Sequence, residues 1–574
     1  MHVASRRLRV LAVLLCLVVM GACAVDDTDD SGAPAADESS DDASSDGDGG
    51  DEDGGDEPAA VDDSGDAVQG GSITFGLESE TPGWLPGTHL MTNYPGQTVA
   101  NTFYDSLTKR NEDGEVQPHL AESLEPNDDL TEWTLTLRPD VTFHDGTPLN
   151  AEALKANFDD HLMAETSNLL GSLRYVEGME VVDDLTVLYT LSQPDAAFPD
   201  VLTGPAGWPF SPTAVEEMGA DEYGSNPVGT GPFRFVSWLR DGELVVERNE
   251  DYWQDGLPYL DEITFRVITD EESRIASLQS GDVDAMQTLR QSAVRQVQAL
   301  DGFESHDFIG NLAGGQLFNT EVPPLDDVRV RRSLMYAIDQ TAILDILGGS
   351  DISPLATQWY SPDSPWYSEA VAEVWPTNDP AQSEALLQEY VDDPERSDGK
   401  APGEPVSLDH NIIPDPSVVE MGLGYKSMWE AVGFEHNMNQ VEVAVIIDTN
   451  ESGDFMINTS RFGNEDDPCI TLRNAFGDPA TTPTNYSNFS TPELQENLET
   501  LCSTTEFDTR YEAVENIMMI LAENVPHTWT GHTPTTVGAR PELRNISGWT
   551  FPDGTLGNGH PMTVVVWSHV WLEQ

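Results

Sequence analysis

The stretch 138–158, RPDVTFHDGTPLNAEALKANF, contains two hydrophobic patterns separated by a turn. Val141 and Phe143 alternate with polar residues, as in a strand, and the apolar residues after the turn recur at helical spacing. The helical positions are Ala151, Leu154, Phe158 and Leu162. Asn150 stands where a helix N-cap is expected. Just upstream, a further strand alternation is formed by Trp133, Leu135 and Leu137. Because strand and helix signals are mixed in this way along the chain, we predict an α/β fold.

The same stretch places a histidine beside an aspartate, at His144 and Asp145, a pairing that also occurs in catalytic sites. The residues that follow, Gly146-Thr147-Pro148, are typical of a turn. Neighbouring residues in a turn seldom converge on one reacting atom. We therefore predict that this pair belongs to a turn between a strand and a helix and does no chemistry.

The N-terminal segment has the parts of a secretory signal, namely arginines, an apolar run and small residues. The apolar run VLAVLLCLVVM (10–20) is shorter than the roughly 18 to 20 residues that span a bilayer. MGAC (20–23) resembles a bacterial lipobox, in which the cysteine is acylated and becomes the first residue of the mature protein. This resemblance implies a signal peptide at 1–22 and lipidation at Cys23.

Residues 23–69 are expected to form a lipid-anchored, acidic, disordered tether. From residue 26 onward the segment consists mainly of Asp, Glu, Ser, Gly, Ala and Pro and contains no basic residue. Such a composition cannot bury enough apolar surface to offset the entropy of ordering the chain.

The rest of the chain is also strongly acidic. The formal net charge is −76; residues 1–25 carry +3 and residues 26–69 carry −18, which leaves −61 for residues 70–574. A surface with this charge repels nucleic acid and anionic lipid. We therefore exclude nucleic acid as a partner and expect membrane attachment through the lipid anchor only.

Cysteine usage predicts one disulfide. Cys16 lies in the signal and Cys23 is the expected lipid site, which leaves Cys469 and Cys502 in the exported domain. In an oxidising compartment such a pair is normally joined.

A charged run at 326–332 precedes an expected helix whose buried face would carry Leu334, Ala337 and Ile338. Its charged residues are Asp326, Asp327, Arg329, Arg331 and Arg332. We interpret the run as a solvated helix start and not as a charged active cluster.

Four blocks of the sequence, in order, resemble the extracellular solute-binding proteins of family 5, the oligopeptide, dipeptide and nickel carriers of ABC importers. The blocks are PHLAESLEPNDDLTEWTLTLRPDVTFHDGTPLNAEAL (118–154), NPVGTGPFRFVSWLRDGELVVERNEDYWQDGLPYLDEITFRV (226–267), ASLQSGDVDAM (276–286) and FNTEVPPLDDVRVRRSLMYAID (318–339). Each block alone is a modest match, and their shared order makes the resemblance specific.

The resemblance implies a two-lobed periplasmic-binding-protein-like α/β fold (class II, cluster C type) with an extra subdomain inserted in the first lobe. The solute-binding domain would cover residues 70–574. Its first lobe would comprise about 70–103, 225–315 and 537–574, the inserted subdomain about 104–224, and the second lobe about 316–536.

In peptide-binding members of the family, the ligand lies between a loop near the N-terminus and a segment reading Trp-x-Ala-Asp-Tyr-x-Asp-Pro, whose first aspartate pairs with the α-amino group. The corresponding segment here is RFGNEDDP (461–468), with Asn464 at the position of that aspartate. A neutral amide lacks the charge-assisted bond to an ammonium. The α-amino clamp is therefore lost unless Glu465 or Asp466 substitutes for it.

The resemblance implies a ligand site with no catalytic residue, no metal and no cofactor. The expected ligand-binding residues are Thr92, Asn93, Tyr94, Arg461, Phe462, Gly463 and Asn464. We predict that Arg461 selects a carboxylate or another anionic group, because its guanidinium offers a fork of donors. The alternative is that Arg461 pairs with one of the many surface acids.

The expected function is capture of a peptide or peptide-like solute and its delivery to the permease subunits of an ABC importer. The protein would act as a monomer at the outer face of the bacterial cell membrane, on the periplasmic side if there are two membranes. A saccharide, an opine or a nickel complex is left open as cargo. His527 and His532 are weak nickel ligands, because residues five apart on a strand point to opposite faces.

An extracellular hydrolase is the alternative from a different class. The sequence has no Gly-x-Ser-x-Gly elbow, no His-Glu-x-x-His motif and no Cys/His pair in a recognisable context. We therefore predict that the protein is not an enzyme.

Overall fold

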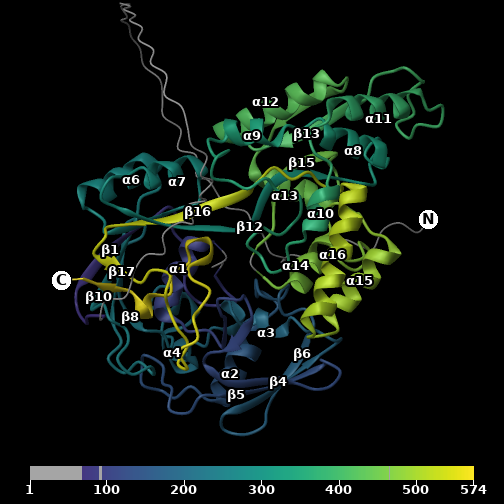
Figure 1. Ribbon diagram of the computed structural model, residues 1–574. Coiled ribbons are helices and arrows are strands. Elements are labelled where there is room, and N and C mark those ends of the chain that lie inside the picture. The colour runs from purple at the N-terminus through teal and green to yellow at the C-terminus, as the bar shows by residue number, and fades with distance from the viewer. Residues whose placement is uncertain (1–66, 90–92, 465, 574) are drawn as a thin grey trace, which may run out of the picture.

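The computed structural model describes residues 67–89, 93–464 and 466–573. Cys23, Thr92, Glu465 and nearly all of the expected tether lie outside these residues. The described chain forms a lobe at the left of Figure 1, a lobe at the right, and a smaller group of strands and helices below them. No helix within the described residues combines the length and apolar character needed to cross a membrane.

One large mixed sheet runs through both lobes. Within the described residues it has ten strands. In spatial order they are β14 (Glu435–Gln440), β13 (Ser407–Ile412), β15 (Ile457–Phe462), β12 (Glu304–Phe318), β16 (His532–Ala539), β11 (Ala285–Thr288), β1 (Ser72–Leu77), β10 (Glu262–Val267), β9 (Glu243–Arg248) and β8 (Phe233–Trp238).

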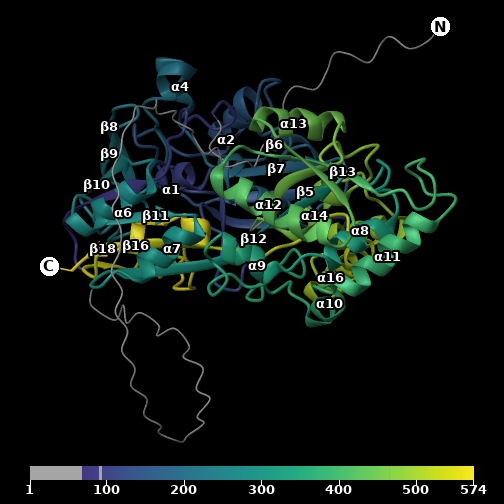
Figure 2. The ribbon, with the colours of Figure 1, turned by 90° about the horizontal axis from the view of Figure 1, so that it is seen from above.

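Strands β12 and β16 connect the two lobes. Residues 304–309 of β12 pair with β16, and residues 313–318 pair with β15 of the second lobe. Between Ile309 and Ala313 the register with β16 is irregular. In the view from above (Figure 2), β12 lies between α6 and β18 at one end and α8 and α11 at the other. The expected division at 315/316 falls inside β12.

Each lobe has its own hydrophobic core. In the first, the ring of Trp567 packs edge-on against Phe75 and Phe265, with centroid distances of 5.1 and 5.5 Å. In the second, Trp429 and Ile517 are fully buried in a separate cluster. Lobes with separate cores can move as units about the strands that join them.

The segment 104–224 forms a small antiparallel sheet with short helices around it, at the bottom of Figure 1. The strand order is β4 (Ala121–Pro126), β5 (Glu132–Leu137), β7 (Thr186–Leu191) and β6 (Val176–Val181). The other elements are β2 (Thr108–Arg110), β3 (Val116–Pro118), α2 (Ala151–Asn157), η1 (Phe158–Leu162), α3 (Phe198–Val201), η2 (Pro205–Gly207), α4 (Pro212–Met218) and α5 (Ala220–Tyr223). Trp133 and Leu135 of β5 share the buried cluster of Phe75, so this segment packs on the first lobe.

The stretch 138–158 folds largely as its pattern predicts. The side chain of Asn150 caps α2 by accepting a hydrogen bond from the Ala153 amide (2.9 Å), and all four helical apolar positions are buried. After Asn157 the helix continues as the π-helical turn η1. The strand expected at Val141 and Phe143 was wrong, because these buried residues lie in irregular backbone on either side of Thr142, which forms a single bridge with Pro148. Alternating burial can arise without a strand.

His144 and Asp145 are engaged in local structure. The Nε2 atom of His144 lies 3.0 Å from the carbonyl oxygen of Gly231, and Asp145 accepts a hydrogen bond from the Thr147 amide (2.9 Å). Burial lowers the pKa of His144 to about 4, so the imidazole is neutral at physiological pH. Both contacts fasten the turn, in agreement with the predicted structural role.

Helices cover the sheet in both lobes, and a small C-terminal group completes the first lobe. The helices of the first lobe are α1 (Tyr94–Phe103), α6 (Glu271–Ser280) and α7 (Gln291–Gln298). Those of the second lobe are α8 (Val328–Tyr336), α9 (Gln340–Ile346), α10 (Glu369–Val374), α11 (Pro380–Asp392), α12 (Pro416–Ala431), α13 (Val443–Ser452), α14 (Pro468–Phe476), α15 (Pro492–Cys502) and α16 (Phe507–Asn524). The C-terminal elements are β17 (Leu543–Arg544), η3 (Pro561–Thr563), η4 (Trp567–His569) and β18 (Trp571–Leu572).

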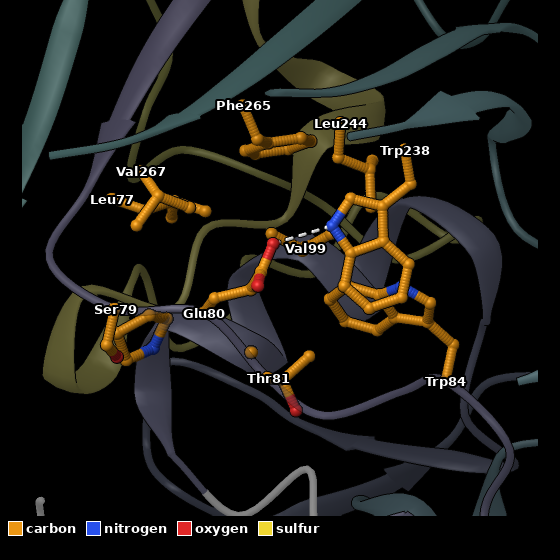
Figure 3. Close-up of a pocket in the computed structure, with 12 residues that line it drawn as sticks. Leu77, Ser79, Glu80, Thr81, Trp84, Val99, Trp238, Leu244, Phe265 and Val267 are labelled. Carbon is orange, nitrogen blue, oxygen red and sulfur yellow. Dashed lines mark hydrogen bonds between the residues drawn. The ribbon is translucent and has the colours of Figure 1, made fainter. Parts of the chain in front are cut away.

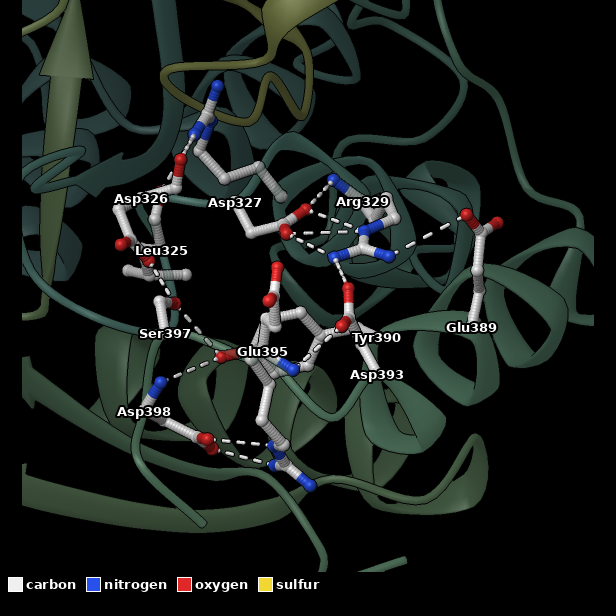
Figure 4. A network of polar contacts seen from close by, with 12 residues as sticks. Leu325, Asp326, Asp327, Arg329, Glu389, Tyr390, Asp393, Glu395, Ser397 and Asp398 are labelled. Atoms are coloured by element: carbon white, nitrogen blue, oxygen red, sulfur yellow. Dashed lines mark hydrogen bonds and ion pairs between the residues drawn. The ribbon is translucent and has the colours of Figure 1, made fainter. Parts of the chain in front are cut away.

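The charged run at 326–332 forms a network at the start of α8 (Figure 4). Asp327 caps the helix by accepting from the Arg329 amide (2.8 Å), and the Arg329 guanidinium binds Asp327 and Asp393 at 2.6 and 3.0 Å. Arg331 departs from the predicted solvated start. It is buried and donates to the carbonyl oxygens of Leu325 and Asn524, each at 2.8 Å. The run is thus structural, but only partly solvated.

Candidate functional site

Two adjoining cavities of about 310 and 270 Å³ lie between the lobes. Both are lined by residues of the inserted segment and of the second lobe. The residues that line both cavities are Ser172, Val201, Asn464, Asp466 and Ile470. Pockets for small solutes commonly measure roughly 300 to 1,000 Å³. The pair of cavities therefore has the size and position of a solute site that both lobes contact.

A much smaller cavity lies inside the first lobe (Figure 3). It measures about 10 Å³ and is bordered by Leu77, Val99 and Phe265. Glu80 points at its wall and accepts a hydrogen bond from Trp238 Nε1 at 2.7 Å. This space is too small for a solute.

Most of the predicted ligand residues line the cavities. Tyr94, at the start of α1, borders the smaller cavity. Arg461, Phe462, Gly463 and Asn464 border the larger one, and Asn464 borders both.

The remaining two predicted ligand residues have other positions. Asn93 lines neither cavity, and its side chain donates to Ser79 Oγ at 3.3 Å. Thr92 lies outside the described residues.

Arg461 extends from the end of β15, where pairing with β12 places it opposite Gly314. Its side chain is exposed to the cleft. Its guanidinium makes no hydrogen bond or salt bridge with any described residue. Within the described chain Arg461 forms no salt bridge with a surface acid, although the charges of Glu78 and Asp415 act on it. Its five donors remain available to a solute.

Gly463 fixes the turn that follows β15. Its φ is +97°, and a Cβ atom at this position would lie 1.8 Å from the carbonyl oxygen of Asn311 on β12. Only glycine combines this backbone angle with such a close approach. The loop that carries Asn464 is therefore seated directly on β12, within the stretch where the register with β16 is irregular.

An aromatic wall borders the larger cavity. The rings of Phe462 and His527 lie 4.4 Å apart, and Trp359 lies 6.2 and 6.4 Å from them. Burial lowers the pKa of His527 to about 3, so its imidazole is neutral. The wall can pack on the apolar part of a solute. Sequence reasoning missed Trp359, which lies in a turn-rich segment without a recognisable motif.

Asp466 supplies a carboxylate at the junction of the two cavities. It is 47% exposed, and it accepts a hydrogen bond from the Asn464 side chain at 2.6 Å. Asp467 is engaged elsewhere, because it caps α14 by accepting from the Cys469 amide (2.8 Å) and binds Arg510. Asp466 thus presents a carboxylate to both cavities beside position 464, and it also lies 3.9 Å from the Arg110 guanidinium.

Asp200 connects the inserted segment to the second lobe. Its carboxylate accepts a hydrogen bond from the Asp467 amide (2.6 Å) and pairs with Arg110. Burial raises the pKa of Asp200 to about 7, although the charge of Arg110 opposes the shift. This contact closes the cleft beside Asp466.

Two further arginines, Arg174 and Arg473, border the larger cavity. Arg473 binds Asp195 at 2.9 Å across the cleft. The guanidinium carbon of Arg473 lies 4.1 Å from the centre of the Tyr175 ring, and that of Arg174 lies 4.7 Å from it. The sequence signal that could have found these residues is the scarcity of basic residues, 26 against 102 acidic ones.

The predicted disulfide between Cys469 and Cys502 is present, with a Cα–Cα distance of 5.2 Å. It ties α14, which carries Ile470 and Arg473 of the cavity wall, to α15. The carbonyl oxygen of Cys502 also accepts a hydrogen bond from the Ala196 amide of the inserted segment (2.8 Å). The disulfide therefore supports the surface on which the lobes meet.

The two histidines considered as nickel ligands differ in their surroundings. His527 faces the larger cavity, whereas His532 is buried at the start of β16. The strand expected around them was only partly right, since β16 begins at His532. Within the described residues, no group of three His, Cys, Asp or Glu side chains is placed to hold a metal ion.

Comparison with curated proteins identifies relatives among binding proteins. The glutathione-binding protein GsiB of Pectobacterium atrosepticum is 35% identical over 302 residues, which is 51% of this chain and 56% of the relative. The protein of the same name from Salmonella typhi has the same identity and coverage. The chain thus spans only a little over half of the length of these relatives.

Solved structures share the fold. A binding protein, AgaA, in complex with agropinic acid, from A. tumefaciens R10, has a TM-score of 0.72 at 22% identity and covers 88% of this chain and 99% of its own. DppA of Helicobacter pylori, in complex with the peptide STSA, has a TM-score of 0.71 at 18% identity with the same coverage. These likenesses establish the two-lobed binding-protein fold.

A family model also matches most of the chain. The model describes bacterial extracellular solute-binding proteins, family 5, and matches residues 115–483. This span includes most of the inserted segment, β12 and the loop that carries Asn464 and Asp466, which border both cavities. The chain belongs to the bacterial extracellular solute-binding proteins of family 5.

Proposed function

We propose that this protein is the solute-binding component of an ABC importer, which closes its two lobes on a peptide or peptide-like solute and delivers it to the permease subunits. The observation that carries the proposal is the pair of cavities between the lobes, lined from both sides. A solute held there contacts both lobes, so its binding favours the closed state. The solute leaves chemically unchanged.

The two ends of the solute would meet opposite charges. Asp466 accepts the ammonium group in place of the aspartate that Asn464 replaces, and Arg461 donates to a carboxylate. The aromatic wall of Trp359, Phe462 and His527 packs on the apolar part between them. Relatives named glutathione-binding proteins support a short peptide-like solute, and glutathione is the first candidate to test.

An opine is the second candidate cargo, because a structural neighbour binds agropinic acid and because Asn464 weakens recognition of a free α-amino group. A saccharide and a nickel complex are the other family-based alternatives. All four classes belong in one comparison of cargo.

Thermal unfolding of the purified protein with glutathione, short peptides, opines, sugars and nickel–histidine identifies the cargo. A solute that binds the folded state raises the melting temperature with the logarithm of its concentration. Mass spectrometry of the same samples should recover the solute intact. Sustained conversion of a peptide or ester would contradict a carrier, and stabilisation by a sugar or nickel complex alone would contradict a peptide-like cargo.

For localisation, we propose anchoring at the outer face of the cell membrane through lipidated Cys23, with the folded part acting as a monomer. Replacing the cysteine (Cys23→Ser) should release soluble protein into the medium or periplasm. Sedimentation of that variant with the membrane fraction would show that another element provides the attachment.

A further inference from the structure

The cleft is lined by more basic than acidic residues, although the whole chain is strongly acidic. The whole sequence has 102 acidic and 26 basic residues. Among the described residues that line the two cavities, five are basic and three are acidic. The basic ones are Lys109, Arg110, Arg174, Arg461 and Arg473, and the acidic ones are Asp195, Asp200 and Asp466. Basic side chains gathered in one cleft of so acidic a protein raise the local concentration of anions.

The cations of the smaller cavity have partners within the protein. Lys109 binds Asp105 at 3.3 Å, and Arg110 binds Asp200. In the larger cavity, Arg473 binds Asp195 at 2.9 Å. These contacts neutralise three of the five positive charges without any solute.

Arg174 and Arg461 differ from these three cations. Neither makes a salt bridge with a described residue. Both border the larger cavity, Arg461 from β15 of the second lobe and Arg174 from the inserted segment between η1 and β6. Burial lowers the pKa of Arg174, and the nearby charge of Arg473 acts in the same direction. Two guanidiniums on opposite walls thus make no salt bridge, although the charge of Asp195 acts on Arg174 and those of Glu78 and Asp415 act on Arg461.

The side chain of Arg174 is held in place by stacking. Tyr175 lies between two guanidiniums, with Arg174 at 4.7 Å and Arg473 at 4.1 Å from its ring centre. Such contacts favour a fixed orientation of the planar group. A guanidinium ordered before the solute arrives loses less entropy on binding.

We infer that the solute carries two anionic groups and one ammonium, with Arg461 and Arg174 each binding one of the anionic groups from opposite walls of the cleft. The inference rests on the proposed function, in which Asp466 receives the ammonium. The two guanidiniums that make no salt bridge then offer binding groups for two negative charges. The substrate class is therefore a zwitterionic dicarboxylate, such as an acidic or γ-glutamyl peptide or an N-carboxyalkyl amino acid. A dicarboxylate that bridges both arginines also holds the lobes together.

Calorimetry of the purified full-length protein with matched tripeptides tests this inference. The probes are Glu-Ala-Gly and γ-Glu-Ala-Gly, with two carboxylates, and Gln-Ala-Gly, with one. At least one dicarboxylate should bind about 10- to 100-fold more tightly than Gln-Ala-Gly, the range expected for one charged hydrogen-bonded contact. Arg174→Gln should remove this preference, whereas Arg174→Lys should retain part of it.

The control variant is Arg295→Gln, at an exposed arginine on α7 that pairs with Asp351 (2.9 Å) outside the cleft. It should retain the full preference. Equal affinities for the three peptides, or a preference that survives Arg174→Gln unchanged, would overturn the inference while the carrier function stands. Binding of none of the peptides at millimolar concentration would contradict both the inference and a peptide-like cargo.

Discussion

Arginine occurs in two contrasting settings, the network at the start of α8 and the cleft between the lobes. In the network, Arg329 has Asp327, Asp393 and Glu389 within 2.6, 3.0 and 3.6 Å. In the cleft, Arg461 has no such partner among the described residues. Charges that are already paired hold the fold, whereas we propose that an accessible charge without a salt bridge binds the solute. The sequence positions of the charged residues do not show which arginines are paired in the fold and which are not.

We expect the largest effect on stability when Arg331, the buried arginine of the network, is replaced. In Arg331→Met, the carbonyl oxygens of Leu325 and Asn524 lose their donor inside the protein. We expect the free energy of unfolding to fall by about 3 kcal/mol, since each unsatisfied buried group costs roughly 1 to 3 kcal/mol. Urea unfolding measures the change, and solute affinity should stay as it was. Unchanged stability would show that water replaces the guanidinium there.

The next effect concerns binding and not stability. Arg461→Ala should weaken binding of a carboxylate-bearing solute by about 1.5 to 3 kcal/mol, the range for hydrogen bonds to charged groups. Because Arg461 has no partner among the described residues, the melting temperature without solute should not fall. Calorimetry and thermal unfolding on the same sample separate the two quantities.

The matched control for Arg461→Ala is Arg329→Gln in the network. There we expect stability to fall by about 0.5 to 1 kcal/mol, as for a partly exposed ion pair, with affinity unchanged. The contrast between the two settings fails if Arg461→Ala destabilises the protein and leaves affinity intact.

The smallest effect is a difference in pH dependence between Asp200 of the cleft and Asp398 of the network. The folded state raises the pKa of Asp200 to about 7 from 3.8, so between these pH values it holds a proton that the unfolded chain has released. The free energy of unfolding therefore decreases as pH rises through this window. In Asp200→Asn that part of the slope should disappear, a change on the order of 1.4 kcal/mol for each pH unit within the window.

Asp398 provides the comparison of opposite sign. Burial by itself would raise its pKa, but hydrogen bonds from Arg396 at 2.6 and 2.7 Å outweigh burial and lower it. Its stabilising contribution is present above the unfolded pKa of 3.8 and is lost as pH falls through the lower, folded value. Asp398→Asn should therefore lose stability at neutral pH. Urea unfolding at pH 5 and pH 8 tests Asp200→Asn, and urea unfolding at about pH 2.5 and pH 5 tests Asp398→Asn. Slopes of equal sign in the two windows would refute the distinction.

Much of the fold could be predicted because its signals are local. The Asn150 cap and the alternation in β5 depend on a few neighbouring residues. The disulfide was predictable because only Cys469 and Cys502 were left in the exported domain. Val141 and Phe143 were misread because alternating burial in irregular backbone gives the same spacing as a strand.

The site was only half accessible to sequence reasoning. Arg461 to Asn464 are consecutive and follow a family motif, so they could be named in advance. Arg174 and Trp359 lie far from them in the chain and reach the cavity only through tertiary packing. No local pattern distinguishes Arg174 from a surface arginine. Its role depends on which acids fold beside it, and that is a property of the closed cleft.

The close approach of Gly463 to β12 determines how little its loop would move when the lobes rotate. A rotation about the irregular stretch of β12 displaces each residue in proportion to its distance from that axis, and the loop at 461–463 lies almost on it. We therefore expect Arg461 to keep nearly the same position when the lobes rotate. Arg174 lies on the inserted segment, across the cleft from Arg461. We expect it to move toward the solute when the lobes close. We expect the solute to bind first at Arg461, near the rotation axis. Its other end would contact Arg174 only after the lobes close.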